Sequence, residues 1–247
     1  MHALRLTFSI FLLCLMAVPA LAGETCNGSD KVCVMGQMEG IIANIENKSW
    51  RDQSYRELAK SYTYAGMPDK AIPLIDKIES PDTKAMTIRG IGFAAADSKW
   101  DKARYDELFK KLAVEAKKIT HPPSQGIAWT YIAMAQAFAG DNAGATATAR
   151  SMENDALRHK AFGESAEIQA ERGDFDTAMA SIAEIDSLSY RNKAYRTVSK
   201  ILTEHNLLDE AYQAAMKIEG NPEAQVQSMQ VILNHGNPEE DEMRLKE

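Results

Sequence analysis

The sequence predicts an all-α fold, an α-solenoid of about five to six antiparallel helix pairs. The first observation behind this prediction is an alanine that returns at a nearly fixed interval, each time five residues after a turn-forming residue. A period of about 33 residues, called here one repeat length, is typical of stacked helix pairs. The alanines are Ala71, Ala103, Ala145, Ala178 and Ala211, and the turn residues are Gly66, Ser98, Gly140, Gly173 and Asn206.

The second observation is the apolar pattern that follows most of these alanines. Apolar residues lie four and then three residues further on, which is a helical and not a strand-like spacing. The sets are Ala71, Ile75 and Ile78, then Ala145, Ala149 and Met152, then Ala178, Ile182 and Ile185, then Ala211, Ala215 and Ile218. Acidic residues near the start suit the positive end of a helix dipole. These segments are predicted to be the second helix of each pair.

The third observation concerns the first helix of each pair. A large aromatic residue stands three helical turns before four of the turn residues, and a small residue follows four positions later. The aromatic residues are Tyr55, Trp129, Phe162 and Tyr195, and the small ones are Ala59, Ala133, Ala166 and Ser199. We expect the helices of a pair to meet through the small residues, with the aromatic rings packed in the core.

These residues resemble a tetratricopeptide repeat, with the pattern Tyr55-x-x-Leu58-Ala59-x-x-Tyr62 followed by Gly66 and Ala71. The copies that begin at Trp129 and Tyr195 match it again, and the copy at Phe162 matches less well because Ser165 replaces a large apolar residue. The second copy fits poorly, since Thr87 and Gly90 occupy the aromatic and large apolar positions. The resemblance covers about residues 51–236 and implies a superhelix whose first helices line a concave peptide-binding groove. It implies no chemistry.

The interval from Ala103 to Ala145 is the longest of the four and predicts a longer second helix. This helix should run from Asp101 to about Ile119, and Pro122 and Pro123 would stop it. The break at residues 120–126 fits a hinge between two parts of the stack and fits a simple surface loop equally well.

Two further segments flank the repeats. Met38, Ile41, Ile42 and Ile45 predict an amphipathic helix that caps the stack together with Trp50. A last helix through Val226 and Ile232 should precede an acidic end. The predicted organisation is a signal peptide at 1–22, a disulfide loop and capping helix at 23–50, helical repeats at 51–236 and an acidic tail at 237–247.

The N-terminus has the pattern of a secretory signal peptide. An apolar stretch from Leu6 to Val18 is broken by Pro19, and Ala20-Leu21-Ala22 is a small-x-small cleavage site. Cleavage after Ala22 predicts a periplasmic or secreted protein. In that compartment Cys26 and Cys33, separated by turn-forming residues, are expected to form a disulfide. A redox pair and a zinc site fit less well, because six residues separate the cysteines and no histidine is near.

Charge and composition limit the partners. Removal of the predicted signal peptide takes only Arg5 from the 28 basic residues and leaves all 35 acidic ones. An acidic chain is poorly suited to nucleic acid or to an anionic membrane surface. No later apolar stretch is long enough to span a bilayer. The histidines form no metal-binding pair, and no phosphate loop or nucleophile elbow is present. We therefore expect no enzyme, no cofactor and no metal.

The predicted function is protein–protein interaction, as an envelope scaffold or adaptor that binds a peptide or protein in the groove. The residues expected to line the groove are Arg56, Lys60, Ile88, Arg89, Gly92, Thr130, Tyr131, Met134, Glu164, Glu167, Lys193, Arg196 and Lys200. An apolar middle with basic ends would suit a peptide with an apolar centre and acidic ends, although ordinary solvated charge explains the same residues. The alternative function is a structural protein that assembles with itself through the end faces of the solenoid.

Overall fold

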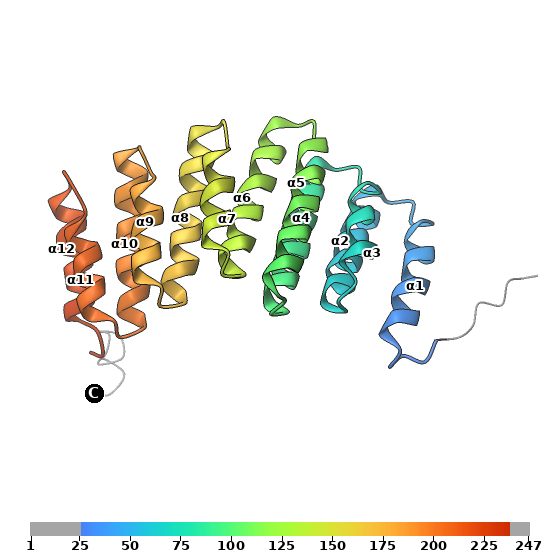
Figure 1. Cartoon of the computed structure of the whole chain (residues 1–247), viewed down its shortest axis with the longest axis horizontal. Helices are drawn as coiled ribbons and strands as arrows, with labels where there is room; N and C mark the ends of the chain where they lie inside the picture. Colours follow the sequence, from blue (N-terminus) through green and yellow to red (C-terminus); the bar gives the residue numbers. More distant parts are fainter. Residues whose placement is uncertain (1–25, 238–247) are drawn as a thin grey trace, which may run out of the picture.

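The computed structural model describes residues 26–237, and within them the fold is all-α. Twelve α-helices and one short 3-10 helix of this part of the chain follow one another in a curved row (Figure 1). The predicted signal peptide and all but the first residue of the predicted acidic tail lie outside the described residues. No helix between residues 26 and 237 is both long enough and apolar enough to cross a membrane.

The row is built from alternating first and second helices. The first helices have 17 residues each: α2 (Lys48–Tyr64), α4 (Pro81–Asp97), α6 (Pro122–Phe138), α8 (Asp155–Glu171) and α10 (Leu188–Glu204). Each starts one repeat length after the last, except that α6 follows α4 at a longer interval. The second helices are α3 (Pro68–Ala71) with the 3-10 helix η1 (Ile72–Ile75), α5 (Lys102–Lys118), α7 (Asn142–Arg150), α9 (Phe175–Ala183) and α11 (Leu208–Met216). Helices α1 (Lys31–Ile42) and α12 (Pro222–Leu233) stand at the two ends.

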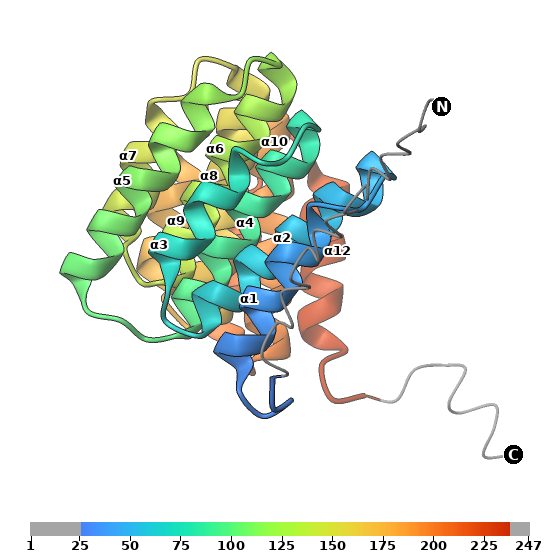
Figure 2. The ribbon, with the colours of Figure 1, turned by 90° about the vertical axis from the view of Figure 1, so that its right-hand side faces the viewer.

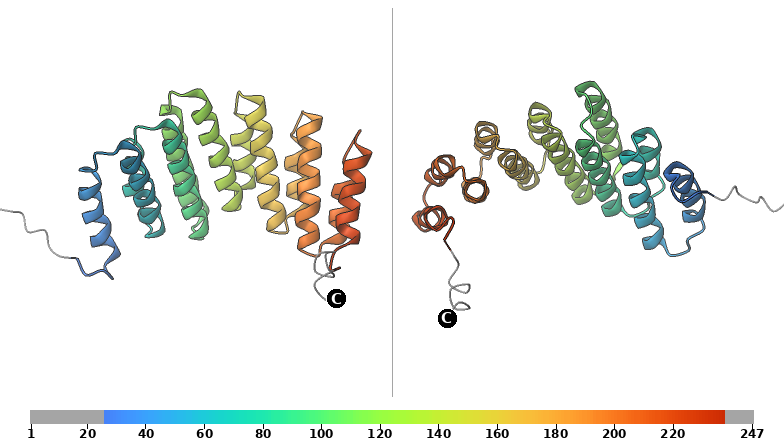
Figure 3. Two further views of the ribbon diagram at one scale, coloured as in Figure 1. Left: turned by 180° about the vertical axis from the view of Figure 1, so that it is seen from behind. Right: turned by 90° about the horizontal axis from the view of Figure 1, so that it is seen from below.

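First helices pack against one another along the row, whereas each second helix packs on its own first helix and on the next one. The view along the row shows the consequence, with α5, α7 and α9 outside the layer of first helices (Figure 2). Figure 3 shows the same row from behind and from below. The crossing alanines Ala71, Ala145, Ala178 and Ala211 are all buried. The aromatic residues Tyr55, Phe162 and Tyr195 are buried too, and Trp129 is half-buried. This arrangement confirms a helical repeat.

The junctions between pairs repeat one set of contacts. At the start of most first helices an Asn or Ser side chain accepts a hydrogen bond from the backbone three residues on, as Asn47 does from Trp50 N at 3.0 Å. Four residues after the capping position, an Arg or Gln side chain donates to the last apolar residue before the cap. The donors are Arg51 to Ile45 O, Gln125 to Ile119 O, Arg158 to Met152 O and Arg191 to Ile185 O. The junctions thereby fix each pair on the preceding one.

The second pair, α4 and α5, corrects the predicted alignment. The left-handed residue of its turn is Lys99, with φ 50°, and not Ser98, with φ −81°. One extra residue, Trp100, then precedes the cap Asp101. As a result Tyr105 takes the place that alanine has in the other pairs, and Ala103 is exposed.

The corrected register also aligns the first helix of this pair, α4, with the other first helices. Ile88, Ile91 and Gly92 lie one repeat length after Tyr55, Leu58 and Ala59, and all are buried. A Cβ atom on Gly92 would lie only 2.6 Å from the Cβ of Ala135, so glycine allows α4 and α6 to approach closely. The poor fit of this repeat in the sequence is therefore a one-residue error of register.

The break at residues 120–126 is short. Pro122 and Pro123 begin α6 and do not form a loop, and α6 runs through Gly126 without interruption. The core nevertheless divides at this helix. One cluster of buried side chains extends from Met35 to Ala135, and another extends from Ala133 to Ala224. Trp129 packs against both clusters, so α6 is the element that the two parts of the row share.

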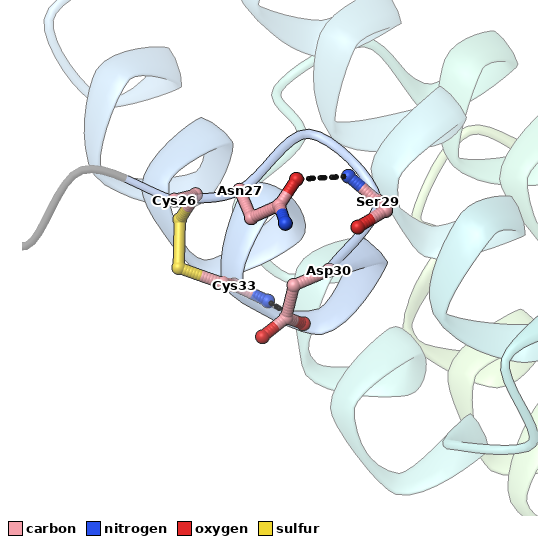
Figure 4. Close-up of a disulfide and its surroundings, with 5 residues drawn as sticks. All are labelled: Cys26, Asn27, Ser29, Asp30 and Cys33. Atoms are coloured by element: carbon pink, nitrogen blue, oxygen red, sulfur yellow. Dashed lines mark hydrogen bonds between the residues drawn. A yellow bond between two sulfur atoms is a disulfide. The ribbon is translucent and has the colours of Figure 1, made fainter.

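The predicted disulfide joins Cys26 to Cys33, with their Cα atoms 5.6 Å apart (Figure 4). The loop that it closes is organised by Asp30, whose side chain accepts from Cys33 N at 3.0 Å and caps α1. Helix α1 is the predicted capping helix, and Met35 and Ile42 are its buried residues. Trp50 and Ile41 do not pack into a cap as predicted, because both side chains are exposed.

Candidate functional site

The candidate site is the face of α2, α4, α6, α8 and α10 that points away from the second helices, called here the first-helix face. All eight cationic, aromatic or thioether residues predicted for binding lie on four of these helices, α2, α4, α6 and α10. Arg56, Lys60, Arg89, Tyr131 and Met134 are half-buried, and Lys193, Arg196 and Lys200 are exposed. Ile88 and Gly92, which the uncorrected register also assigned to the groove, are buried in the core instead. Thr130 on α6, also predicted for the groove, is buried as well.

On α2, the predicted basic end is partly neutralised. Glu57 lies between Arg56 and Lys60 and pairs with both, at 2.9 Å from Arg56 Nη2 and 2.7 Å from Lys60 Nζ. The hydrogen bond from Lys60, and then that from Arg56, holds the pKa of Glu57 below its usual value, although partial burial opposes the shift. The two cations on this helix therefore already have a partner.

On α4 and α6, five side chains form an aromatic cluster that consists of Met86, Arg89, Phe93, Tyr131 and Phe138. The guanidinium of Arg89 lies over the rings of Phe93 and Tyr131, 4.6 and 5.6 Å from their centroids. Phe93 meets Phe138 edge-on with centroids 4.9 Å apart, and the Tyr131 hydroxyl donates to Met86 Sδ at 3.4 Å. These contacts hold Arg89 on an aromatic surface.

Arg89 differs from Arg56, its counterpart one repeat earlier, in having no ion pair with any residue between 26 and 237. The reason is local, since Gly90 occupies the place that Glu57 has on α2. The cluster continues into a surface pocket of about 240 Å³ lined by Phe93, Phe138, Ala96, Asp97 and Lys99. An unpaired cation thus stands beside a mostly apolar recess that Asp97 and Lys99 also line.

On α8 and α10, the face is divided by charge. Helix α8 presents Glu164, Glu167 and Glu171, whereas α10 presents Lys193, Arg196 and Lys200. Burial raises the pKa of Glu167, the negative charge of Glu164 adds to the rise, and Lys193 opposes it. Lys200 is 3.6 Å from Glu204, while Lys193 and Arg196 form no ion pair within the described residues.

Met86, Phe93 and Phe138 are members of the cluster that the sequence does not predict. Phe93 was lost through the register error, because the correct interval places it one repeat length after Lys60. With the corrected register, the spacing alone would have assigned Phe93 to the face. Phe138 could not be recognised in this way, because its contact with Phe93 depends on how α4 and α6 cross.

In the part of the chain that the structure describes, the remaining polar groups do not assemble into a second centre. No group of three His, Cys, Asp or Glu side chains in residues 26–237 could hold a metal ion. His159 Nε2 and Ser165 Oγ are buried without hydrogen-bond partners, and the His159 ring lies 5.5 Å from that of Tyr190. His159 lies at the junction position that Asp52 and Asn192 occupy in other repeats, where their side chains accept hydrogen bonds from the backbone before the next first helix. Its place is therefore a packing position between helix pairs.

Comparison with protein-family models, with curated proteins and with solved structures finds no match to this chain. The classification therefore depends on the residues and their geometry alone, and these make the described part of the chain an all-α helical-repeat protein.

Proposed function

We propose that the chain is an exported, tetratricopeptide-like α-solenoid that binds a protein or peptide partner on its first-helix face and acts as a scaffold or adaptor in the cell envelope. The observation that carries the proposal is Arg89, an unpaired guanidinium held against Phe93 and Tyr131. Arginine and tyrosine are among the side chains that most often dominate binding energy at protein interfaces. No reaction is assigned to the chain.

The chemistry of the cluster specifies the partner. The edge of a stacked guanidinium is free to donate two parallel hydrogen bonds to a carboxylate. The recess beside Phe93 and Phe138 suits an apolar side chain of the same segment. The partner is therefore a peptide segment with a carboxylate next to an apolar residue. Lys193 and Arg196 would take further acidic groups of a longer segment, while Glu164 and Glu167 would repel them from α8.

The test is peptide display against the mature chain, followed by fluorescence anisotropy with the enriched peptides. We expect enrichment of apolar residues next to Asp, Glu or a C-terminal carboxylate. Arg89→Ala should weaken binding of such a peptide at least tenfold, which corresponds to about 1.4 kcal/mol. Replacing the carboxylate of the peptide by an amide should weaken binding by the wild-type protein to a similar degree.

The matched control is Arg56→Ala, which removes the equivalent cation one repeat earlier. Because Glu57 already neutralises Arg56, this change should alter affinity less than twofold. Both variants should keep the wild-type melting temperature. Enriched peptides that lack acidic groups, or equal losses for the two variants, would contradict the proposal.

Export is a separate part of the proposal. It is supported by the pattern of residues 1–22 and by the Cys26–Cys33 disulfide, a bond that persists in oxidising compartments. Mass spectrometry of the protein from a cell that expresses the full gene should give a chain that starts at Gly23. A full-length chain in the cytosolic fraction would contradict export and leave the binding proposal intact.

A further inference from the structure

The row of helices begins with a helix of the second kind, α1, and ends with a helix of the first kind, α12. Helix α1 has the register of a second helix, because Met38, Ile42 and Ile45 precede Ala71, Ile75 and Ile78 by one repeat length. It also packs on α2 as each second helix packs on the next first helix. The first helix that should partner α1 is missing from the described residues.

The exposure of two side chains marks the missing neighbour of α1. Ile41 is 66% exposed, although Leu74, its counterpart in the next repeat, is only 1% exposed. Trp50 on α2 is also 66% exposed. Trp50 corresponds to Ser124 and Leu157, which both contact the preceding first helix: Ser124 Oγ donates to Asp82, and Leu157 lies against Gly126. Ile41 and Trp50 therefore face a place that no first helix among residues 26–237 fills.

Helix α12 shows the opposite deficiency. It follows α10 at the spacing of a first helix and packs on α10 and α11 accordingly, but no second helix follows it up to residue 237. Leu233 is 76% exposed, although its counterparts on four earlier first helices, Ala59, Ala133, Ala166 and Ser199, are buried. Val226, which corresponds to Gly126, is 52% exposed.

Within residues 26–237, α1 thus has no first helix to pair with, and α12 has no second helix. The two ends lie at opposite extremities of the row, so one copy cannot join them (Figure 1). Repeat proteins normally end in polar caps because a terminal repeat has one neighbour only, and both ends here expose large apolar side chains. We propose that copies of this chain associate head to tail, with α1 of one copy packing on α12 of the next as its second helix.

The repeat geometry specifies the contacts. Within the row Gly126 on α6 contacts Leu157 on α8. At the interface Val226 takes the place of Gly126 and Trp50 of the next copy takes the place of Leu157. Ile41 of that copy covers α12 beside Leu233. Because the two surfaces differ, each added copy presents a new free end until a ring closes, and the assembly is not a closed dimer.

The first test is the molar mass of the mature chain, measured by light scattering over a range of concentrations. We expect the mass to rise continuously with concentration. Ile41→Asp and Leu233→Asp should each leave a monomer, with an unchanged melting temperature because both side chains are exposed in the single copy. A mixture of the two variants should form one-to-one dimers, since each retains one intact end.

The second test is a cross-link between copies. Trp50→Cys and Val226→Cys, mixed as separate proteins, should form a disulfide-linked heterodimer under mild oxidation, with the native Cys26–Cys33 bond intact. The matched control pairs Trp50→Cys with Ala180→Cys, an exposed position on α9, and should not cross-link efficiently. Preferential self-coupling of Val226→Cys would indicate a symmetric contact and overturn the proposal.

Two other results would also overturn it. A wild-type chain that stays monomeric at all concentrations excludes the interface. A chain that associates only after residues 238–247 are removed shows that its own C-terminal segment covers α12. Neither result bears on peptide binding by the first-helix face, which Arg89→Ala tests independently.

Discussion

The adjacent pairs α4/α5 and α6/α7 solve the same packing problem in different ways. In α6/α7, Gly140 turns the chain, Asp141 caps a nine-residue helix and Ala145 crosses the first helix closely. In α4/α5, the turn has one more residue, the second helix has 17 residues, and Tyr105 occupies the crossing position. The first helices are nevertheless identical in length and register. The additional residues of α4/α5 lie in the turn and in the longer second helix. The first-helix face therefore stays regular while the second helices vary in length.

The largest difference between the two pairs is expected when a charged residue replaces Ala145 or Ala103, the two alanines that the sequence alone places in equivalent positions. Ala145→Glu places an unpaired carboxylate at a buried crossing and should lower the free energy of unfolding by about 4 kcal/mol. Ala103→Glu, on the exposed first turn of α5, should change it by less than about 0.5 kcal/mol. Urea unfolding followed by circular dichroism measures both. Similar losses in the free energy of unfolding for the two variants would contradict the corrected register and support the equivalence of Ala103 and Ala145.

Tyr105 is the next place to test the comparison. Its ring is buried between Trp100 and Phe109, and its hydroxyl lies within hydrogen-bond distance of the carbonyl oxygens of Ala95 and Ala96 at the end of α4. Tyr105→Ala should cost about 3–5 kcal/mol in the same unfolding measurement. Tyr105→Phe keeps the ring and loses the hydrogen bonds, so it should cost only about 1 kcal/mol. A small loss for the alanine variant would mean that α5 does not depend on this side chain.

The junctions allow a smaller comparison. Asp52 is buried and accepts from the backbone N–H groups of Glu79 and Ser80 at 2.8–3.1 Å, so Asp52→Ala should cost about 2–3 kcal/mol. His159 occupies the same position on α8 with an unpaired nitrogen. His159→Asn should instead stabilise the chain by about 1 kcal/mol, because asparagine can bind the junction as Asn192 does at 2.7 and 3.1 Å. Thermal melting distinguishes these opposite signs.

The smallest expected effect is at the turns. Lys99 adopts a left-handed conformation that costs a residue with a Cβ atom about 1–2 kcal/mol, part of which glycine recovers after its own entropy cost. Lys99→Gly should therefore raise the free energy of unfolding by about 0.5 kcal/mol. Gly140→Ala, with φ 81°, should lower it by about 1 kcal/mol. A loss of stability in Lys99→Gly would show that Lys99 contributes contacts of its own.

The same contrast explains what could be predicted from the sequence. Glycine or asparagine stands at the left-handed position in four of the turns, and there the alanine, the apolar positions and the aromatic residues all fall into register. Lysine at position 99 carries no such preference, so the sequence indicates the nearby Ser98 as the turn residue and shifts the second repeat by one residue. The disulfide followed from two cysteines close together in a chain with a signal-peptide pattern.

The site was harder to predict, because it depends on which side chains meet across helices. The sequence assigned Arg56 and Arg89 to the same groove but did not show that they occupy equivalent positions. Only the structure distinguishes them, by the ion pair with Glu57 on α2 and the aromatic rings beneath Arg89 on α4. The exposure of Ile41 on α1 and of Trp50 on α2 was also unpredictable, since an amphipathic helix beside a repeat array normally covers its neighbours.

The division of the core at α6 has a mechanical consequence. The larger buried clusters on either side are joined through one helix and the half-buried ring of Trp129. If the two ends of the molecule are pulled apart, the part around one cluster can unfold while the part around the other cluster stays folded. Stretching in an optical trap is therefore expected to lengthen the chain in two separate events, with α6 as the boundary between them.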